Sequence, residues 1–343
     1  VVTARMAGRL TTFKGILDRL LVGDRGGLAR AITLTESTKA SSRAAGQRLV
    51  SAALEASRKR VDKTGRQTFR VGLSGPPGAG KSTLIERMGQ LLIERGHRVA
   101  VLSIDPSSSV TGGSILGDKT RMPMLSRDAA AFVRPSSSTG TLGGVARATC
   151  DSVVLCEAAG YDVVLVETVG VGQSETAVAD MVDMYVLIVP PGGGDVLQGL
   201  KRGIVELVDI VLVNKADGDL LAAARRAQRE YLSALKLLRR RTELWAPPVL
   251  AVSAIEGDGV EDAWDTMLEY HTIMDEAGAL ETKRGEQAKL WLWTHVTDQL
   301  MARFKASPEV CERVEAVQHH VEAAELTPGQ GADALLDAAF KER

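Results

Sequence analysis

Hydrophobic positions alternate between two patterns from about residue 66 to residue 257. Short apolar runs, typical of buried strands, begin near Phe69, Arg98, Ala131, Asp162, Met184, Ile210 and Val249. Between the runs, apolar residues recur with helical spacing, as at Leu84, Ile85, Met88, Leu91 and Leu92. This alternation predicts an α/β fold in which a mostly parallel sheet lies between helical layers.

Both ends of the chain show helical periodicity and no strand pattern. In the first part the repeating positions are Leu10, Phe13, Ile16, Leu17, Leu20 and Leu21. In the last part they are Trp264, Met267, Leu268, His271, Trp293, Val296, Leu300, Met301 and Phe304. We therefore predict a helical N-terminal extension at 1–65, a core domain at 66–257 and a helical C-terminal arm at 258–343.

Composition and charge narrow the classes of function. The chain is 45% hydrophobic, which is ample for a core, and its 42 basic and 43 acidic residues give a net charge of −1. That balance gives no reason to propose nucleic acid or an anionic membrane as a partner. No apolar run approaches the roughly 18 residues of a membrane span. The three cysteines, Cys150, Cys156 and Cys311, have no metal or redox spacing, so we expect free thiols and a cytoplasmic protein.

A complete G-x-x-x-x-G-K-S pattern occupies residues 75–82, directly after the first apolar run. Glycines allow successive backbone amides to point at the α- and β-phosphates, Lys81 can reach the β/γ oxygens, and the Ser82 hydroxyl can ligate Mg²⁺. The helix predicted next adds its positive dipole end. We expect a nucleoside triphosphate to bind here, at Gly75, Pro76, Pro77, Gly78, Ala79, Gly80, Lys81, Ser82 and Thr83.

A second motif indicates which base is bound. The apolar run at 210–213 ends in an N-K-x-D signature formed by Asn214, Lys215 and Asp217. The Asp217 carboxylate can accept two hydrogen bonds from guanine, whereas adenine offers no matching donors on that edge. The next run ends in Ser253 and Ala254, whose backbone amide could reach guanine O6. The pattern favours GTP and GDP over adenine nucleotides, although N-K-x-D alone is also compatible with a helix cap.

Acidic residues follow two of the other strands. Asp105 ends the run near residue 98, and Glu167 ends the run near residue 162 and opens an E-x-x-G where many GTPases have D-x-x-G. Both are candidates for the Mg²⁺ side of the site, with strand-end caps as the alternative. Asp118, in the stretch around Gly117, is a third candidate and is equally compatible with a turn.

These motifs together resemble the MeaB/MMAA/ArgK family of SIMIBI-class P-loop GTPases, and its bacterial MeaB branch in particular. The resemblance rests on the phosphate loop, the D-P-S-S at 105–108, the E-T-V-G-V-G-Q-S-E at 167–175, the P-G-G-G-D at 191–195 and the N-K-A-D at 214–217. It covers most of the chain. It implies a P-loop NTPase fold and a Mg²⁺-dependent GTPase that acts as a chaperone of adenosylcobalamin-dependent methylmalonyl-CoA mutase, assisting cofactor loading and protecting the enzyme.

The resemblance also implies roles for individual residues. Asp105 and Asp118 correspond to the family's magnesium-side acids, and Gln173 is a candidate for orienting the attacking water. Asp195 and Lys201 lie in the equivalent of a third switch that communicates with the mutase. The C-terminal arm is implied to form a homodimer.

Two alternative functions remain open on the sequence. The ArgK name reflects an older interpretation as a kinase of transport-related proteins, and a phosphate loop does not exclude transfer to an acceptor other than water. A metal-delivery GTPase is a second alternative, although the only adjacent histidines, His319 and His320, would point in different directions on a helix.

Overall fold

The computed structural model describes residues 12–37, 39–104, 122–135, 142–168, 174–192, 202–238 and 241–340. The candidates Asp105, Asp118, Gln173, Asp195 and Lys201 lie outside these ranges. The chain divides into two compact units, Val1–Gln287 and Ala288–Arg343.

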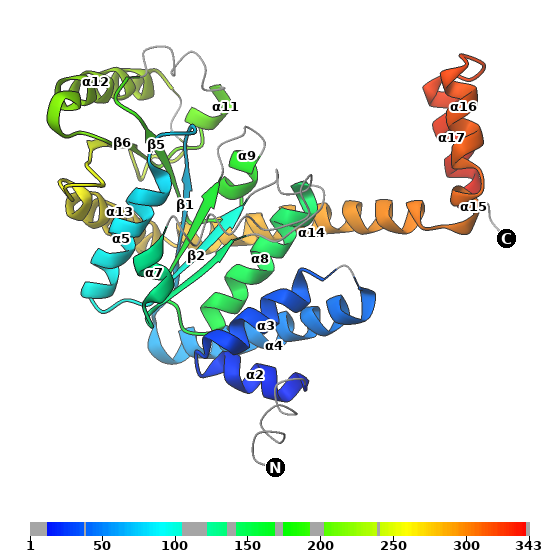
Figure 1. Ribbon diagram of the computed structural model, residues 1–343, viewed down its shortest axis with the longest axis horizontal. Coiled ribbons are helices and arrows are strands. Elements are labelled where there is room, and N and C mark those ends of the chain that lie inside the picture. Colours follow the sequence, from blue (N-terminus) through cyan, green and yellow to red (C-terminus); the bar gives the residue numbers. More distant parts are fainter. Residues whose placement is uncertain are drawn as a thin grey trace. The chain divides into compact units, whose positions relative to one another are not determined.

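The first unit is built around one seven-stranded sheet, with a strand for each run expected from the sequence (Figure 1). The strands are β1 (Phe69–Ser74), β2 (Val99–Ile104), β3 (Ala131–Pro135), β4 (Val163–Thr168), β5 (Met184–Val189), β6 (Ile210–Val213) and β7 (Val249–Ala251). Their order is β3-β2-β4-β1-β5-β6-β7, and every neighbouring pair is parallel. The carboxyl ends of all seven therefore meet at one edge, where ligands bind in this class of sheet.

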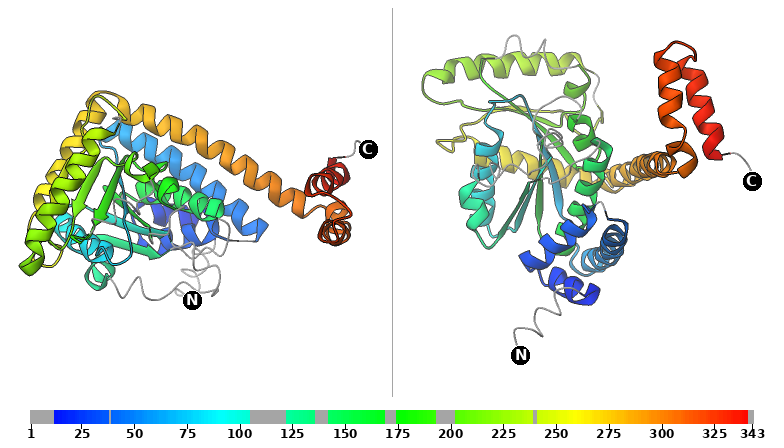
Figure 2. Two further views of the ribbon diagram at one scale, coloured as in Figure 1. Left: turned by 90° about the horizontal axis from the view of Figure 1, so that it is seen from above. Right: turned by 45° about the vertical axis from the view of Figure 1, so that its right-hand side comes forward.

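Helices cover both faces of the sheet, as the alternating pattern predicted (Figure 2). One face carries α5 (Lys81–Glu94), α7 (Pro123–Arg127) and α13 (Val260–Glu276), and the other carries α8 (Leu142–Ala158) and α9 (Ser174–Ala179). The short α11 (Arg202–Val205) precedes β6, and the 3₁₀ turn η2 (Gly218–Leu220) leads into α12 (Leu221–Leu237), which packs beside β6 and β7.

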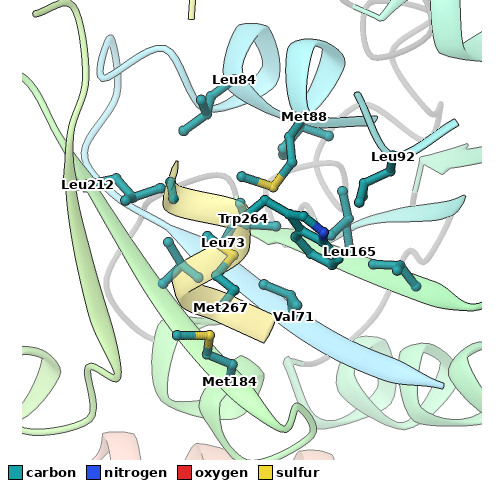
Figure 3. Packing of buried hydrophobic residues seen from close by; sticks show 14 of the residues in the cluster. Val71, Leu73, Leu84, Met88, Leu92, Leu165, Met184, Leu212, Trp264 and Met267 are labelled. Carbon is teal, nitrogen blue, oxygen red and sulfur yellow. The ribbon is translucent and has the colours of Figure 1, made fainter. Parts of the chain in front are cut away.

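The main hydrophobic core lies between the sheet and the layer of α5 and α13. Trp264 and Met267 of α13 pack among Leu84 and Met88 of α5 and the side chains of the central strands, such as Leu73 (Figure 3). Trp264 is fully buried. Trp264 and Met267 of the helical stripe seen in the sequence are thus part of the core of the sheet domain, whereas Leu268 of that stripe is exposed.

The boundary between the two compact units differs from the boundaries predicted from the sequence. The predicted C-terminal arm begins at residue 258, but α13 and the start of α14 (Ala279–Lys305) belong to the first compact unit, which extends to Gln287. The domain boundaries predicted at residues 65 and 257 remain a prediction.

The described residues of the N-terminal extension are helical, as expected. They form α2 (Phe13–Leu21), α3 (Arg25–Thr35) and α4 (Ala40–Thr64), and these helices pack against α8. Asp24 caps α3 by accepting a hydrogen bond from the Gly27 amide at 2.6 Å. Between α4 and α8, Gln47 Nε2 donates to Asp151 Oδ2 at 2.6 Å.

A buried ion pair joins the start of α14 to the amino ends of the strands. Arg284 donates through Nε to Asp183 Oδ1 at 2.7 Å and through Nη2 to Asp183 Oδ2 at 2.6 Å. Asp183, directly before β5, is fully buried and also accepts a hydrogen bond from the Arg70 amide of β1 at 2.9 Å. Burial raises the pKa of Asp183, but the hydrogen bonds it accepts from Arg284 and the nearby positive charges outweigh that effect and hold the pKa below its usual range.

The last strand in the order, β7, is short. It spans three residues, and Gln228 Nε2 of α12 donates to the carbonyl oxygen of Val249 at 2.8 Å. A side chain from the neighbouring helix therefore occupies a backbone acceptor at this edge of the sheet.

The second unit is helical throughout its described residues. It contains the second part of α14, α15 (Pro308–Cys311), α16 (Val314–Glu322) and α17 (Pro328–Phe340). Phe340 of α17 stacks on Phe304 of α14 with ring centroids 6.2 Å apart. No helix among the described residues of the chain is long and apolar enough to cross a membrane.

Candidate functional site

The G-x-x-x-x-G-K-S segment forms the turn from β1 into α5. Gly75 has φ +155°, and a Cβ there would lie 2.0 Å from the Ile188 carbonyl oxygen of β5. Gly80 has φ +87°, and a Cβ there would lie 2.5 Å from Asn214 Nδ2. These contacts explain why both positions require glycine, since any side chain would push the loop away from its neighbours.

Lys81 begins α5 and is almost completely buried. Its Nζ donates to the carbonyl oxygens of Gly75, at 2.7 Å, and Pro76, at 3.2 Å. The ammonium group therefore lies over the loop whose amides the sequence predicted to face phosphates. A positive charge held there suits a triphosphate with its negative oxygens.

Ser82 and Glu167 meet across the carboxyl edge of the sheet. The Ser82 hydroxyl at the start of α5 donates to Glu167 Oε1 of β4 at 2.9 Å. A hydroxyl and a carboxylate are the hard oxygen donors that Mg²⁺ prefers, so the two side chains fit a magnesium ion bound beside the phosphates. Among the described residues no cluster of three or more His, Cys, Asp or Glu side chains could hold a metal ion.

Asn214 joins the base motif to the phosphate loop. It follows β6 and is buried, and its Nδ2 donates to the carbonyl oxygens of Ala79 at 2.9 Å and Gly80 at 3.4 Å. Its Oδ1 accepts a hydrogen bond from the backbone amide of Ala254 at 3.1 Å. One amide side chain thus holds three loops together at the edge of the sheet.

Asp217 is oriented by Ser253. The Ser253 hydroxyl, which is fully buried after β7, donates to Asp217 Oδ2 at 2.5 Å and accepts from the Glu256 amide at 3.1 Å. Lys215 has φ +62°, a conformation that is uncommon for a residue with a side chain. An aspartate fixed in this way leaves its remaining lone pairs for the two donors of a guanine edge.

The amide of Ala254, which the sequence placed near guanine O6, bonds to Asn214 in this structure. It donates to Asn214 Oδ1, so a contact with guanine O6 requires the amide to share or exchange that acceptor. Asn214 therefore bonds to the phosphate loop on one side and to Ala254 on the other.

Two hydroxyls of this region were not singled out from the sequence. Thr168 directly follows Glu167, and Ser74 directly precedes Gly75, and the Thr168 hydroxyl donates to Ser74 Oγ at 3.0 Å. Both are fully buried. The available signal was a polar residue at the carboxyl end of an otherwise apolar strand; Thr168 lies within the run at 167–175, but no role was assigned to it.

Comparisons with known proteins agree on one group of relatives. The sequence profile described as "Methylmalonyl Co-A mutase-associated GTPase MeaB" matches residues 28–309. The chain is similar to the mouse protein "Methylmalonic aciduria type A homolog, mitochondrial", with 53% identity over 94% of this chain and 78% of that protein. It is also similar to "GTPase ArgK" of Escherichia coli strain K12, with 45% identity over 85% of this chain and 86% of that protein.

A solved structure supports the same grouping. The crystal structure described as "LAO/AO transport system kinase" superposes with a TM-score of 0.72 and 34% identity, covering 95% of this chain and 97% of the other.

Proposed function

This chain belongs to the MeaB family of methylmalonyl-CoA mutase-associated GTPases and is itself a GTPase, and from that premise we propose that it is a chaperone of an adenosylcobalamin-dependent methylmalonyl-CoA mutase. In this role it assists cofactor loading and protects the mutase, using GTP hydrolysis to reset the contact between the two proteins. Support comes from a family match that spans residues 28–309 and therefore includes both nucleotide motifs.

The observation that carries the nucleotide assignment is the bond network of Asn214, which joins the two motifs into one site. We propose that residues 75–83 hold the phosphates and that Lys81 exchanges its two carbonyl contacts for β/γ-phosphate oxygens. Asp217 reads guanine, supported by the Ser253 hydroxyl, while Lys215 lies along the base.

We assign magnesium to Ser82 and Glu167, whose oxygens already meet at 2.9 Å. Mg²⁺ at such a site neutralises charge on the β- and γ-phosphate oxygens. Asp105 and Asp118 are further candidates for the same side of the site, on the resemblance alone. Gln173 is proposed to orient the attacking water, with Lys201 and Asp195 coupling the site to the mutase.

We also propose that the second unit forms a homodimer. Its part of α14 exposes a stripe of large apolar side chains at helical spacing, including Trp293, Val296 and Leu300, and Trp293 is 68% exposed. Contiguous exposed apolar side chains often mark a surface that another chain covers. Cytoplasmic location stays a prediction.

The proposal is tested by measuring phosphate release from GTP with and without purified adenosylcobalamin-dependent methylmalonyl-CoA mutase. Lys81→Ala serves as the blank, since it removes the cation that contacts the phosphates. We expect the mutase to accelerate hydrolysis several-fold, because a chaperone's switch must respond to its partner. Unchanged turnover with an active mutase would contradict the chaperone role.

The same reaction distinguishes a GTP hydrolase from the alternative kinase. With γ-labelled GTP, a hydrolase releases all of the label as free phosphate, whereas a kinase leaves label on an added transport-related protein. Equilibrium dialysis against nickel addresses the metal-delivery alternative, which requires stoichiometric binding of a metal other than magnesium.

A further inference from the structure

A small polar cluster lies inside the apolar layer beneath the phosphate loop. Ser74, Thr168 and Tyr185 come from the three central strands β1, β4 and β5, and each is fully buried. The Thr168 hydroxyl donates to Ser74 Oγ at 3.0 Å. None of the three belongs to the residues assigned to nucleotide or magnesium.

Strand register places this cluster on the opposite face of the sheet from Glu167. Successive side chains of a strand point to opposite faces, and Leu73 of β1 is paired with Glu167 of β4. Leu73 belongs to the core on the side of α5, which is where Glu167 meets Ser82. Thr168 therefore points to the other face, where Ser74 lies one residue beyond Leu73.

The two hydroxyls consequently join the two backbone segments that carry the site. Ser74 immediately precedes Gly75, the first residue of the phosphate loop, and Thr168 immediately follows Glu167 in the chain. The hydrogen bond between them fixes the end of β4 against the end of β1. A shift of either strand end would move the Glu167 carboxylate relative to Ser82.

Helix α9 closes the cluster from the second face. Gly72 of β1 allows this approach, because a Cβ there would lie 2.6 Å from Val178 of α9. Glu175, in the first turn of α9, is buried, and Tyr185 is paired with Gly72 in the sheet. Burial raises the pKa of the Tyr185 hydroxyl, which the nearby Ser74 lowers and the nearby Glu175 raises further.

Stability alone does not require hydroxyls here. Valine has nearly the shape of threonine, and replacing both partners of a buried hydrogen bond by apolar groups of similar shape is often close to neutral. Unpaired hydroxyls in such a place would be costly. The Ser74 and Thr168 hydroxyls pair at the two strand ends that lead to the phosphate loop and to Glu167. We therefore expect this pair to fix the positions of those site residues.

We propose that Ser74 and Thr168 are positioning residues for GTP hydrolysis, which hold the end of β4 against the phosphate loop and so aim Glu167 at the side of Ser82. They act through the backbone and touch neither nucleotide nor metal. The inference rests on the assignment of Glu167 to the magnesium side of the site.

The test compares Thr168→Val with Thr168→Ser in the full chain, without mutase. We expect Thr168→Val to lower kcat for GTP roughly three- to tenfold, the loss that corresponds to one misplaced neutral hydrogen bond, while the Kd for GDP changes less than about twofold. Thr168→Ser keeps the hydroxyl and should recover most of the lost kcat.

A double substitution asks whether the two hydroxyls act as one pair. Ser74→Ala combined with Thr168→Val should lose no more kcat than either single change, because each already breaks the same bond. Thr68→Val is the matched control. Its buried hydroxyl, before β1 at the other end of that strand, donates to the Tyr161 carbonyl at 2.8 Å, so its loss should lower thermal stability and leave kcat unchanged.

Two results would overturn the inference. One is a Thr168→Val protein with a lowered melting temperature and an unchanged kcat. The other is a Thr168→Ser protein as impaired as Thr168→Val. The magnesium dependence of GTP hydrolysis by Glu167→Gln is measured in parallel. If that dependence is the same as in the wild type, the assignment of Glu167 to magnesium is wrong. If the dependence changes but Thr168→Val has a normal kcat, only the positioning role is wrong.

Discussion

Selectivity for guanine depends on a single carboxylate and on the hydroxyl that orients it. Asp217 is half-buried and holds one oxygen toward Ser253, so its direction is set before any ligand arrives. An acceptor that is already oriented loses little entropy on binding, and an acceptor left unpaired by the wrong base is costly. These two effects together make Asp217 the residue whose change should alter the base preference most directly.

We expect Asp217→Asn to weaken GTP binding by roughly a thousandfold or more and to shift preference toward xanthosine triphosphate, whose edge offers an acceptor in place of the guanine amine. Competition of GTP, XTP and ATP against a fluorescent nucleotide measures this. Asp219→Asn, an exposed carboxylate two residues along the chain, is the control and should bind as the wild type does. Unchanged guanine selectivity in Asp217→Asn would show that the base is bound elsewhere.

Asp151 is a buried carboxylate whose effect on stability depends on pH. Burial raises its pKa from 3.8 to about 6, and the hydrogen bond from Gln47 opposes that rise. The unfolded chain ionises it near pH 4, so stability falls as pH rises from about 4 to about 6 and is lower by at most about 3 kcal/mol above that window.

Asp151→Asn should therefore be more stable than the wild type above pH 6 and equally stable below pH 4. Denaturant unfolding at pH 4, 6 and 8 gives the comparison, with Asp333→Asn, an exposed carboxylate, as control. A benefit of the substitution that is the same at all three pH values would mean that ionisation of Asp151 is not its cause.

At the scale of elements, the start of α14 is attached to the sheet through charge. Asp183 is fully buried at the amino ends of the strands, and Arg284 holds both of its oxygens. The same guanidinium donates to the Thr68 carbonyl at 2.7 Å and to Gln67 at 3.0 Å, so α14 contacts the segments directly before β5 and before β1 through one side chain. Breaking one partner of such a pair leaves a buried charge without compensation.

Removing the Arg284 charge should accordingly destabilise the first unit. We expect Arg284→Gln to lower the free energy of unfolding by about 3–5 kcal/mol at neutral pH. Because the lowered pKa of Asp183 stabilises the fold above its ordinary value of 3.8 and this benefit is lost as pH falls below it, the difference between variant and wild type should shrink in acid. Arg303→Gln, on the exposed part of α14, is the control. An equally large decrease in its free energy of unfolding would contradict the role given to the pair of Arg284 and Asp183.

At the scale of the whole molecule, the apolar stripe of the second unit predicts association. Trp293→Glu places a charge in the middle of the proposed dimer contact and should convert dimer to monomer, because a buried unpaired carboxylate is costly. Sedimentation velocity at several concentrations measures the change. Ala302→Glu adds the same charge to an exposed position on the opposite face of α14, nine residues from Trp293, and should leave the mass unchanged. A wild-type protein that sediments as a monomer at every concentration would contradict the dimer.

The strands and the nucleotide motifs could be predicted because their signals are local. Each parallel strand is a continuous apolar run, and residues 75–82 carry their chemistry within eight positions. The order of the strands, the packing of Trp264 under the sheet and the bond between Ser74 and Thr168 could not be predicted, because each joins segments far apart in sequence. A hydrophobic helical stripe indicates that a helix is buried, and it does not indicate against which element.

The edge at β7 has a consequence for handling the protein. An exposed strand edge can recruit a strand from another molecule, but β7 offers only three residues and the Val249 carbonyl is already occupied by Gln228. Concentrated folded protein should therefore not be lost through strand addition at this edge. Precipitation on heating would then follow unfolding, and Gln228→Ala, which frees that carbonyl, is the substitution to avoid in a sample meant for long storage.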